Sequence, residues 1–210
     1  MCSDCRTGLP WLDCARCPQC ALPTPGGQRC GQCLRKPPAF DRSHCRLAYA
    51  FPLDRLILQY KYGHQLALAG PLAELLRDTA AGSAGVELIL PVPLHPNRLR
   101  ERGFNQTLEL LRPWANRQAL QADAIQRTQH GAHQAALPWQ QRERNIKGAF
   151  ACASADLRGR TVAIVDDVMT TGATLNELAR TLKRAGAAEV ECWVLARALP
   201  HSHTARNANP

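Results

Sequence analysis

The chain has 210 residues, of which 45% are apolar, so it can bury a core of ordinary size and is not a low-complexity or collagen-like polymer. Its apolar runs are too short to cross a bilayer, and no basic, apolar leader opens it. We therefore expect a cytoplasmic protein without membrane insertion. Lys and Arg outnumber Asp and Glu by 26 to 17, which indicates either an anionic partner or only a solvated basic surface.

The first 45 residues are rich in cysteine and hold eight of the ten in the chain. Cys17-x-x-Cys20 and Cys30-x-x-Cys33 are separated by nine residues, and two such turns can place four thiolates around one zinc ion. A segment this short buries little apolar surface, so a metal would supply folding free energy. Disulfides are the competing use, which a cytosolic location disfavours. We predict a zinc ribbon over residues 1–44.

Other cysteines have less certain roles. Cys2-x-x-Cys5 is a third turn of the same type, and its two cysteines are further candidate metal ligands. Cys14 and Cys45 either complete a second site or have no metal role. Two more lie in apolar, strand-like surroundings and are predicted to be core residues: Cys152 and Cys192.

A larger domain is predicted over residues 45–198, followed by a polar tail over 199–210 that we expect to be disordered. Its first elements follow from apolar spacing and from proline positions. They are a strand over Cys45–Pro52, helices over Leu53–Tyr62 and Leu66–Leu76, and a strand over Val86–Pro93 that ends at prolines. A basic loop, Leu94–Gln106, then opens a helix that we expect to bend at Pro113.

The segment from Ala122 to Ile146 is long for a connection without periodicity, and we expect it to be a mobile lid. Its His130 and His133 can simply be solvated. Trp139 is predicted to be a packing group or, in this basic segment, a platform for a base.

The most informative stretch runs from Val162 to Thr174. Val162–Val165 is an apolar run typical of a strand buried in a parallel sheet, and two acids, Asp166 and Asp167, follow it. In open α/β sheets ligands bind beyond the carboxyl ends of the strands. The small, hydroxyl-rich residues Thr170–Thr174 can close backbone N–H groups on a phosphate at the start of the next helix.

The two carboxylates would repel a phosphate but can accept hydrogen bonds from neighbouring hydroxyls. The following helix carries apolar residues on one face and stops at Gly186, and Glu189–Ala196 is predicted to be the last strand. This alternation predicts a doubly wound α/β fold with a largely parallel sheet. A strand, turn and helix without a ligand is the simpler alternative.

Four hydrophobic residues, two acids and Thr-Thr-Gly-x-Thr resemble the phosphoribosyl pyrophosphate (PRPP) signature of the type I phosphoribosyltransferases. The resemblance implies that Asp166 and Asp167 are catalytic and hold the ribose 2′ and 3′ hydroxyls. It also implies that the 5-phosphate is wrapped by Thr170, Thr171, Gly172, Ala173 and Thr174. The turn at Pro93, Leu94 and His95, with Arg98, would hold pyrophosphate, and Mg²⁺ would bridge pyrophosphate and ribose.

Further stretches narrow the resemblance. Pro91–Pro93, Arg102–Gln106 and Arg127-Thr128, joined to the cysteine-rich start, resemble the ComF/GntX family of competence-type proteins. The resemblance runs from Cys2 to about Arg197. Family members commonly begin with a further C-x-x-C that this chain lacks.

The family resemblance implies a PRPP-binding protein of natural transformation that handles incoming single-stranded DNA on the cytoplasmic side. Candidate contacts to the DNA backbone are Arg100, Arg102, Arg142, Arg144 and Lys147. Two alternatives stay open. One is an active phosphoribosyltransferase with an unidentified acceptor. The other is a PRPP sensor whose ribbon recruits a DNA-translocation helicase or another competence protein. The sequence does not give the oligomeric state, or say whether the ribbon contacts DNA or protein.

Overall fold

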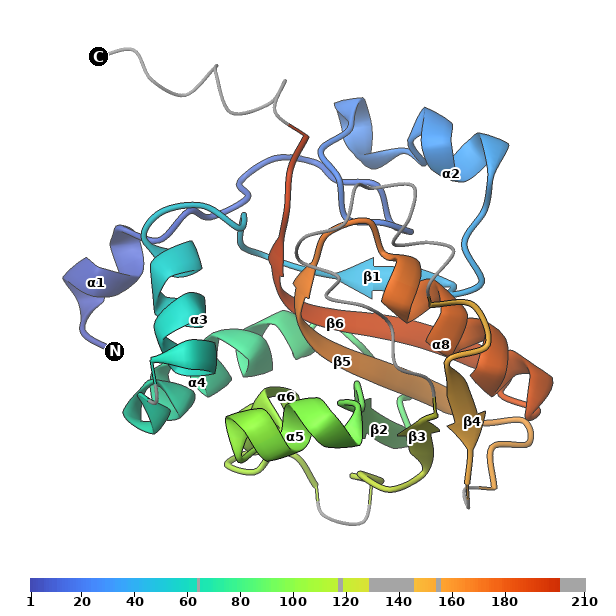
Figure 1. Ribbon diagram of the computed structural model, residues 1–210. Coiled ribbons are helices and arrows are strands. Elements are labelled where there is room, and N and C mark those ends of the chain that lie inside the picture. The colour runs from blue at the N-terminus through green and yellow to red at the C-terminus, as the bar shows by residue number, and fades with distance from the viewer. Residues whose placement is uncertain (64, 117–118, 129–145, 154–155, 201–210) are drawn as a thin grey trace.

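A computed structural model describes residues 1–63, 65–116, 119–128, 146–153 and 156–200. Its centre is a four-stranded sheet in the order β1-β6-β5-β2, in which every neighbouring pair is parallel (Figure 1). The strands are β1 Arg42–His44, β2 Leu88–Pro91, β5 Thr161–Met169 and β6 Glu189–Arg197. The predicted α/β fold with a parallel sheet is confirmed.

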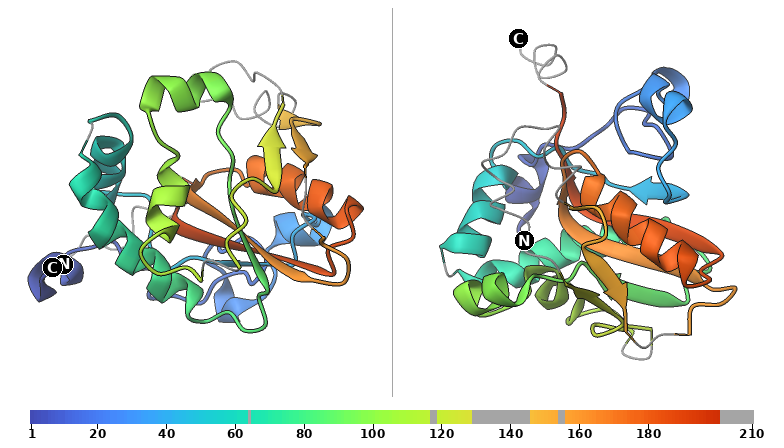
Figure 2. Two further views of the ribbon diagram at one scale, coloured as in Figure 1. Left: turned by 90° about the horizontal axis from the view of Figure 1, so that it is seen from below. Right: turned by 45° about the vertical axis from the view of Figure 1, so that its right-hand side comes forward.

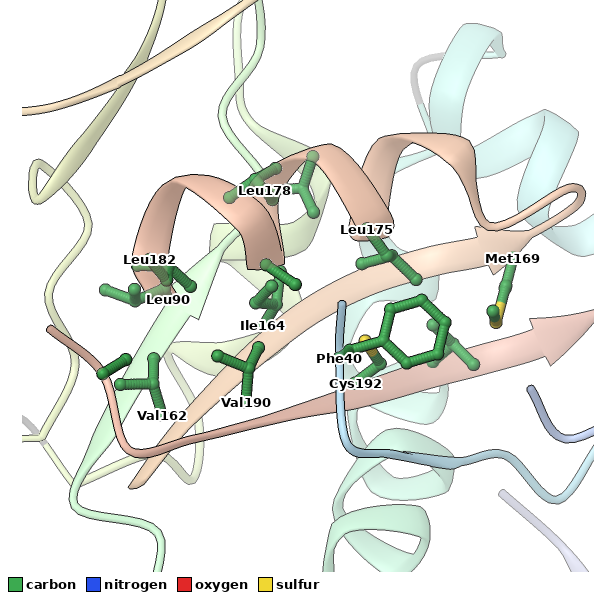
Figure 3. Packing of buried hydrophobic residues seen from close by; sticks show 14 of the residues in the cluster. Phe40, Leu90, Val162, Ile164, Met169, Leu175, Leu178, Leu182, Val190 and Cys192 are labelled. Atoms are coloured by element: carbon green, nitrogen blue, oxygen red, sulfur yellow. The ribbon is translucent and has the colours of Figure 1, made fainter. Parts of the chain in front are cut away.

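Helices cover both faces of this sheet. Helix α8, Ala173–Arg184, lies on one face, and the other carries α3 Leu53–Tyr62, α4 Ala69–Ala80 and α6 Gln106–Leu111 (Figures 1 and 2). The four apolar residues of β5 explain the two layers, because successive strand residues point to opposite faces. Val162 and Ile164 pack towards α8 (Figure 3), whereas Ala163 and Val165 pack towards α3, α4 and α6.

The cysteine-rich start contains α1 Ser3–Thr7, a 3-10 helix, η1 Pro25–Gly27, and α2 Gly31–Arg35. Its two C-x-x-C turns pack on the α8 side of the sheet, since Cys17, Cys20 and Cys33 belong to the same apolar cluster as Leu175 of α8. Helix α1 lies on the opposite side, where Arg6 forms an ion pair with Asp78 of α4. Gln32 and Cys33 of α2 line the same small cavity as Thr171 and Gly172 of the loop that joins β5 to α8. The ribbon therefore lies next to the predicted phosphate-binding loop.

A second sheet pairs β3 Ile125–Arg127 with β4 Phe150–Cys152 in antiparallel fashion. The predicted lid falls largely between these strands, and residues 129–145 lie outside the described residues. That range includes the DNA-binding candidates Arg142 and Arg144, together with His130, His133 and Trp139. Most of the predicted tail, 201–210, also lies outside them. In the part of the chain that is described, no helix combines the length and apolarity needed to cross a membrane.

The predicted first strand, Cys45–Pro52, is wrong. Strand β1 ends at His44, and pairing resumes only briefly: the Arg197 amide donates to the Leu47 carbonyl at 2.8 Å, and the Tyr49 amide donates to the Arg197 carbonyl at 2.8 Å. The chain then leaves the sheet to begin α3 at Leu53.

Three other elements also differ from prediction. The segment predicted as a helix from Leu66 begins as a 3-10 turn, η2 Leu66–Leu68, and continues as α4 to Ala80. Part of the predicted basic loop is a helix, α5 Pro96–Arg102, with proline at its first position and Gly103 left-handed at its end (φ 82°). Helix α6 ends at Leu111 and does not bend at Pro113, since proline cannot continue the hydrogen-bond ladder.

Candidate functional site

The acidic pair, expected at the carboxyl end of its strand, is followed by Val168 and Met169 and so lies inside β5. The strand continues to Met169 because Val168 and Met169 pair with Ala196 and Arg197 of β6. Asp166 is half-buried and Asp167 is 3% exposed. Each carboxylate accepts the next backbone amide, Asp166 Oδ1 at 2.9 Å and Asp167 Oδ1 at 2.7 Å. As neighbours in a strand, the two side chains point to opposite faces of the sheet.

On the α3 side, Asp167 forms a buried ion pair. Its Oδ2 lies 2.5 Å from Nζ of Lys61, and the two side chains are 5% and 17% exposed. Burial acts to lower the pKa of Lys61, but the Asp167 carboxylate outweighs burial and the pKa is raised on balance. Sequence reasoning missed Lys61. A signal existed, since Lys61 stands four residues after Ile57 and so on the buried face of α3.

Replacing Lys61 by Met is expected to destabilise the protein by about 3–5 kcal/mol, because it leaves a buried carboxylate without a counter-charge. Urea unfolding measures this change. Arg55→Met is the matched control, as Arg55 is exposed on the same helix, and it should stay within about 0.5 kcal/mol of the parent. Equal stabilities of the two variants would show that the Lys61–Asp167 pair adds nothing.

Asp166 lies on the α8 side of the sheet, the face towards which Ile164 also packs. Burial, and then the Asp167 carboxylate, raise the pKa of Asp166 well above its ordinary value. The guanidinium of Arg127 lies near enough to interact with this carboxylate. Burial lowers the pKa of Arg127, the charge of Arg98 lowers it further, and Asp166 acts in the opposite direction. Sequence analysis named Arg127 only as part of the family resemblance. The structure places it near Arg98 and Asp166, so it becomes a candidate site residue.

The loop from Thr170 to Gly172 joins β5 to α8. Gly172 adopts φ 78°, a left-handed conformation that favours glycine, and a Cβ there would lie 2.8 Å from Cε of Met169, so the end of that side chain would have to shift. The Thr171 hydroxyl accepts the Ala173 amide at 2.9 Å and closes the turn. Thr170 and Thr174 are half-buried beside it. The loop and the first amides of a helix as long as α8 form an arrangement that suits an anion.

The predicted pyrophosphate turn follows β2. Pro93 is buried there, and Leu94 and His95 are half-buried. His95 Nδ1 accepts the Asn97 amide at 3.2 Å and caps α5, which also carries the half-buried Arg98. The Val92 amide donates to the Val165 carbonyl at 2.9 Å, so this turn begins beside β5.

The segment Arg102–Gln106 holds these helices in place. Asn105 Oδ1 accepts the Thr107 amide at 3.0 Å, and Nδ2 donates to the Val92 carbonyl at 3.2 Å. The Tyr60 hydroxyl donates to the Gln106 carbonyl at 2.8 Å. The Arg102 guanidinium lies 4.9 Å from the centre of the Tyr62 ring, and Arg102 is half-buried. Two DNA-binding candidates are exposed: Arg100 and Lys147.

A cavity of about 520 Å³ lies beside the pyrophosphate turn. Pro93 and Leu94 of the turn form one wall, and Phe104 and Arg127 belong to its lining. It is large enough for a small organic molecule.

The four cysteines of the predicted ribbon come together. Their sulfur atoms all lie within 4.8 Å of one another, and Sγ of Cys20 is 3.6 Å from Sγ of Cys30, which fits four thiolates around one tetrahedral ion. Burial acts to raise the pKa of Cys17, but backbone amides, first that of Cys30, outweigh it and lower the pKa to about 7. The cluster of Cys17, Cys20, Cys30 and Cys33 could hold a metal ion.

The other cysteines of the first 45 residues lie outside this cluster. Cys2 and Cys5 are exposed around α1, and Cys14 is exposed as well. The thiol of buried Cys45 donates to the Leu47 carbonyl at 3.3 Å. Among the described residues the cluster of four is the one group of three or more candidate metal ligands found, and a metal role for Cys2 and Cys5 stays a prediction.

Comparison with known proteins adds independent findings. A model of the phosphoribosyl transferase domain matches residues 119–208. The DNA utilization protein YhgH of Escherichia coli strain K12 is 40% identical over 209 residues, which cover 95% of this chain and 91% of that protein. Competence protein F of Haemophilus influenzae is 35% identical over 182 residues, with 81% and 79% covered. A solved hypoxanthine-guanine phosphoribosyltransferase from Bacillus anthracis superimposes with a TM-score of 0.39 at 17% identity, covering 64% of this chain and 69% of that one.

Both relatives exceed 30% identity over most of their own length, and the domain match falls on the part of the chain that carries the acidic pair. The chain therefore belongs to the ComF/GntX family, the family of competence and DNA utilization proteins that join a cysteine cluster to a phosphoribosyltransferase domain.

Proposed function

We propose that this protein binds PRPP and acts in natural transformation, where it handles incoming single-stranded DNA on the cytoplasmic side. One observation carries the PRPP part. The half-buried Asp166, the loop from Thr170 to Gly172 and the start of α8 follow one another along the chain. The Val92 amide donates to the Val165 carbonyl at 2.9 Å, so the turn that leads to Arg98 begins beside Asp166. A sugar with phosphates at both ends needs an acceptor for hydroxyls between two anion-binding groups.

In the proposed complex, the Asp166 carboxylate accepts hydrogen bonds from the ribose hydroxyls. The backbone amides after Thr170 and the start of α8 hold the 5-phosphate, and Arg98 and Arg127 hold the pyrophosphate. Asp167 supports the ribose site through its ion pair with Lys61. Mg²⁺, when bound, would offset the charge of pyrophosphate near the acidic pair, and carboxylate and phosphate oxygens are the ligands that it prefers.

The cysteine cluster is proposed to hold one structural Zn²⁺. Four thiolates in two C-x-x-C turns suit zinc, and the cluster packs on the sheet through Cys17, Cys20 and Cys33. Bound zinc fixes the two turns and supplies folding free energy to a segment with little core of its own.

The names of the relatives, competence protein and DNA utilization protein, support the DNA role. In this proposal the exposed Arg100 of α5 and Lys147 before β4 contact the DNA backbone, as does Arg102 at the end of α5. Each phosphate contact releases counterions, so affinity should fall steeply with salt.

We expect the double variant Arg100→Ala, Lys147→Ala to bind single-stranded DNA more weakly and with a shallower salt dependence. The slope of log affinity against log salt should decrease by about 0.7 for each lost phosphate contact. Fluorescence anisotropy with a labelled oligonucleotide between low and moderate salt measures both quantities. The double variant Arg55→Ala, Arg184→Ala removes two exposed charges elsewhere and should leave the slope unchanged. An identical slope in both double variants would contradict this placement of the DNA.

A second function, transfer of phosphoribosyl from PRPP to an acceptor, is favoured by the cavity of about 520 Å³ beside Pro93 and Leu94. An acceptor held there would lie next to the proposed pyrophosphate turn. Release of pyrophosphate in the presence of candidate nitrogen bases tests this activity. Binding of PRPP without any release would leave the binding function alone.

A further inference from the structure

Arg197 is an arginine with almost no access to solvent. It is the last residue of β6 and is 3% exposed. Its guanidinium reaches backbone carbonyls of three separate segments. Nε donates to Cys20 at 2.8 Å, and Nη1 donates to Met169 at 2.8 Å, to Ala198 at 2.9 Å and to Thr170.

These acceptors connect the two halves of the molecule. Cys20 is one of the four candidate metal ligands, and its carbonyl belongs to the first C-x-x-C turn. Met169 and Thr170 lead into the loop that we propose to hold the 5-phosphate. One buried guanidinium therefore hydrogen-bonds both to the metal-binding turn and to the start of the phosphate loop.

The ribbon also contacts the loop directly. The Ala39 amide donates to Oδ1 of Asn176 in the first turn of α8 at 2.7 Å. Phe40 lies between the sheet and α8, next to Leu175 (Figure 3), and its ring would be 3.9 Å from a Cβ at Gly172. Beside these contacts lies a small cavity of about 60 Å³, whose lining includes Cys20 and Cys33 of the ribbon and Thr171 and Gly172 of the loop.

We propose that Arg197 is a positioning residue that couples metal binding in the cysteine cluster to the shape of the phosphate loop. With the metal bound, the Cys20 turn is fixed and Arg197 holds the Met169 and Thr170 carbonyls inward, which leaves the following amides to the ligand. Without the metal the turn loosens and the guanidinium loses a buried acceptor. It must then find another partner or admit water, so the loop is no longer held.

The coupling can be measured without PRPP. Amide hydrogen exchange at residues 170–174 is compared between metal-loaded and chelator-treated full-length protein, with the amides of Val162–Val165 as an internal reference and metal content assayed. In the wild type, metal removal should speed exchange of the loop by about tenfold. In Arg197→Met the loop should already exchange fast, so that metal removal changes it by less than about twofold. Arg197→Lys should fall between the two.

Arg184→Met, which removes a mostly exposed arginine of α8, is the matched control and should behave as the wild type. An equal effect of metal removal in Arg197→Met and wild type would overturn the proposal, as would no effect in the wild type. If the reference amides also lose protection on metal removal, or if Arg197→Met does not fold, metal-loaded Arg197→Lys decides the question. It should exchange faster than the wild type at the loop alone, and equal exchange would overturn the proposal.

The consequence for ligand binding rests on the proposed PRPP function. Calorimetry should show PRPP binding about tenfold more weakly to metal-free wild type and to Arg197→Lys than to the metal-loaded wild type. If PRPP gives no heat with any form, the proposed function fails, whereas the exchange experiment still decides the role of Arg197. If PRPP binds equally to all forms, the coupling fails and the binding function stands.

Discussion

Replacing Asp166 by Asn should weaken PRPP binding by about 100-fold, because a carboxylate that accepts hydrogen bonds from sugar hydroxyls contributes about 1.5–3 kcal/mol for each charged bond. The variant should fold at least as stably as the parent. Burial and the Asp167 carboxylate raise the pKa of Asp166 in the folded protein, so ionised Asp166 costs folding free energy as the pH rises above its unfolded pKa, and asparagine removes that cost. Calorimetry with Mg²⁺ and urea unfolding measure the two quantities.

Asp167→Asn provides the contrast. It removes one partner of a buried ion pair with Lys61, so it should lower stability by several kcal/mol and weaken PRPP binding less than Asp166→Asn does. Asp156→Asn, at an exposed position, is the control and should change neither. If Asp167→Asn abolished binding at unchanged stability while Asp166→Asn bound normally, the proposed roles of the two acids would be reversed.

Loss of the metal should have the second large effect. The double variant Cys17→Ser, Cys33→Ser is expected to retain no zinc, since two ligands cannot replace the four thiolates of the cluster. Structural zinc contributes about 10 kcal/mol or more to the folding of small sites at neutral pH, so the ribbon should unfold. Elemental analysis of the purified protein and proteolysis of the first 44 residues detect the two changes.

The control for this experiment is Cys14→Ser, which changes an exposed cysteine outside the cluster and should keep one zinc per chain. Burial raises the pKa of Cys20 to about 11, so zinc binding must displace its proton, and zinc affinity should fall as the pH is lowered. Full zinc content in the double variant would contradict the assignment of the cluster as the metal site.

The sequence predicted correctly those elements whose bounds depend only on residues next to one another in the chain. Helix α3 has the predicted bounds of Leu53–Tyr62, because its apolar spacing and Gly63 define both face and end. The buried part of β5 could also be predicted, since the side chains of Val162–Val165 face two apolar layers. Two C-x-x-C turns sufficed to predict the cluster of four cysteines.

What the sequence could not show depends on partners distant in the chain. The end of β5 is set by β6, whose last residues pair with Val168 and Met169, so the acidic pair lies within the strand. Strand β1 is short because only Arg42–His44 remain in register with β6. The buried charges Lys61 and Arg197 look like ordinary basic residues until the fold brings Asp167 and the Cys20 carbonyl to them.

Calorimetry tests the central claim most directly. PRPP is titrated into folded, zinc-loaded protein in the presence of Mg²⁺. The proposed site predicts saturable heat for one molecule of PRPP per chain, and that heat should be lost at the same concentrations in Asp166→Asn. The absence of heat at every magnesium concentration, from protein with intact zinc and cooperative unfolding, would contradict it.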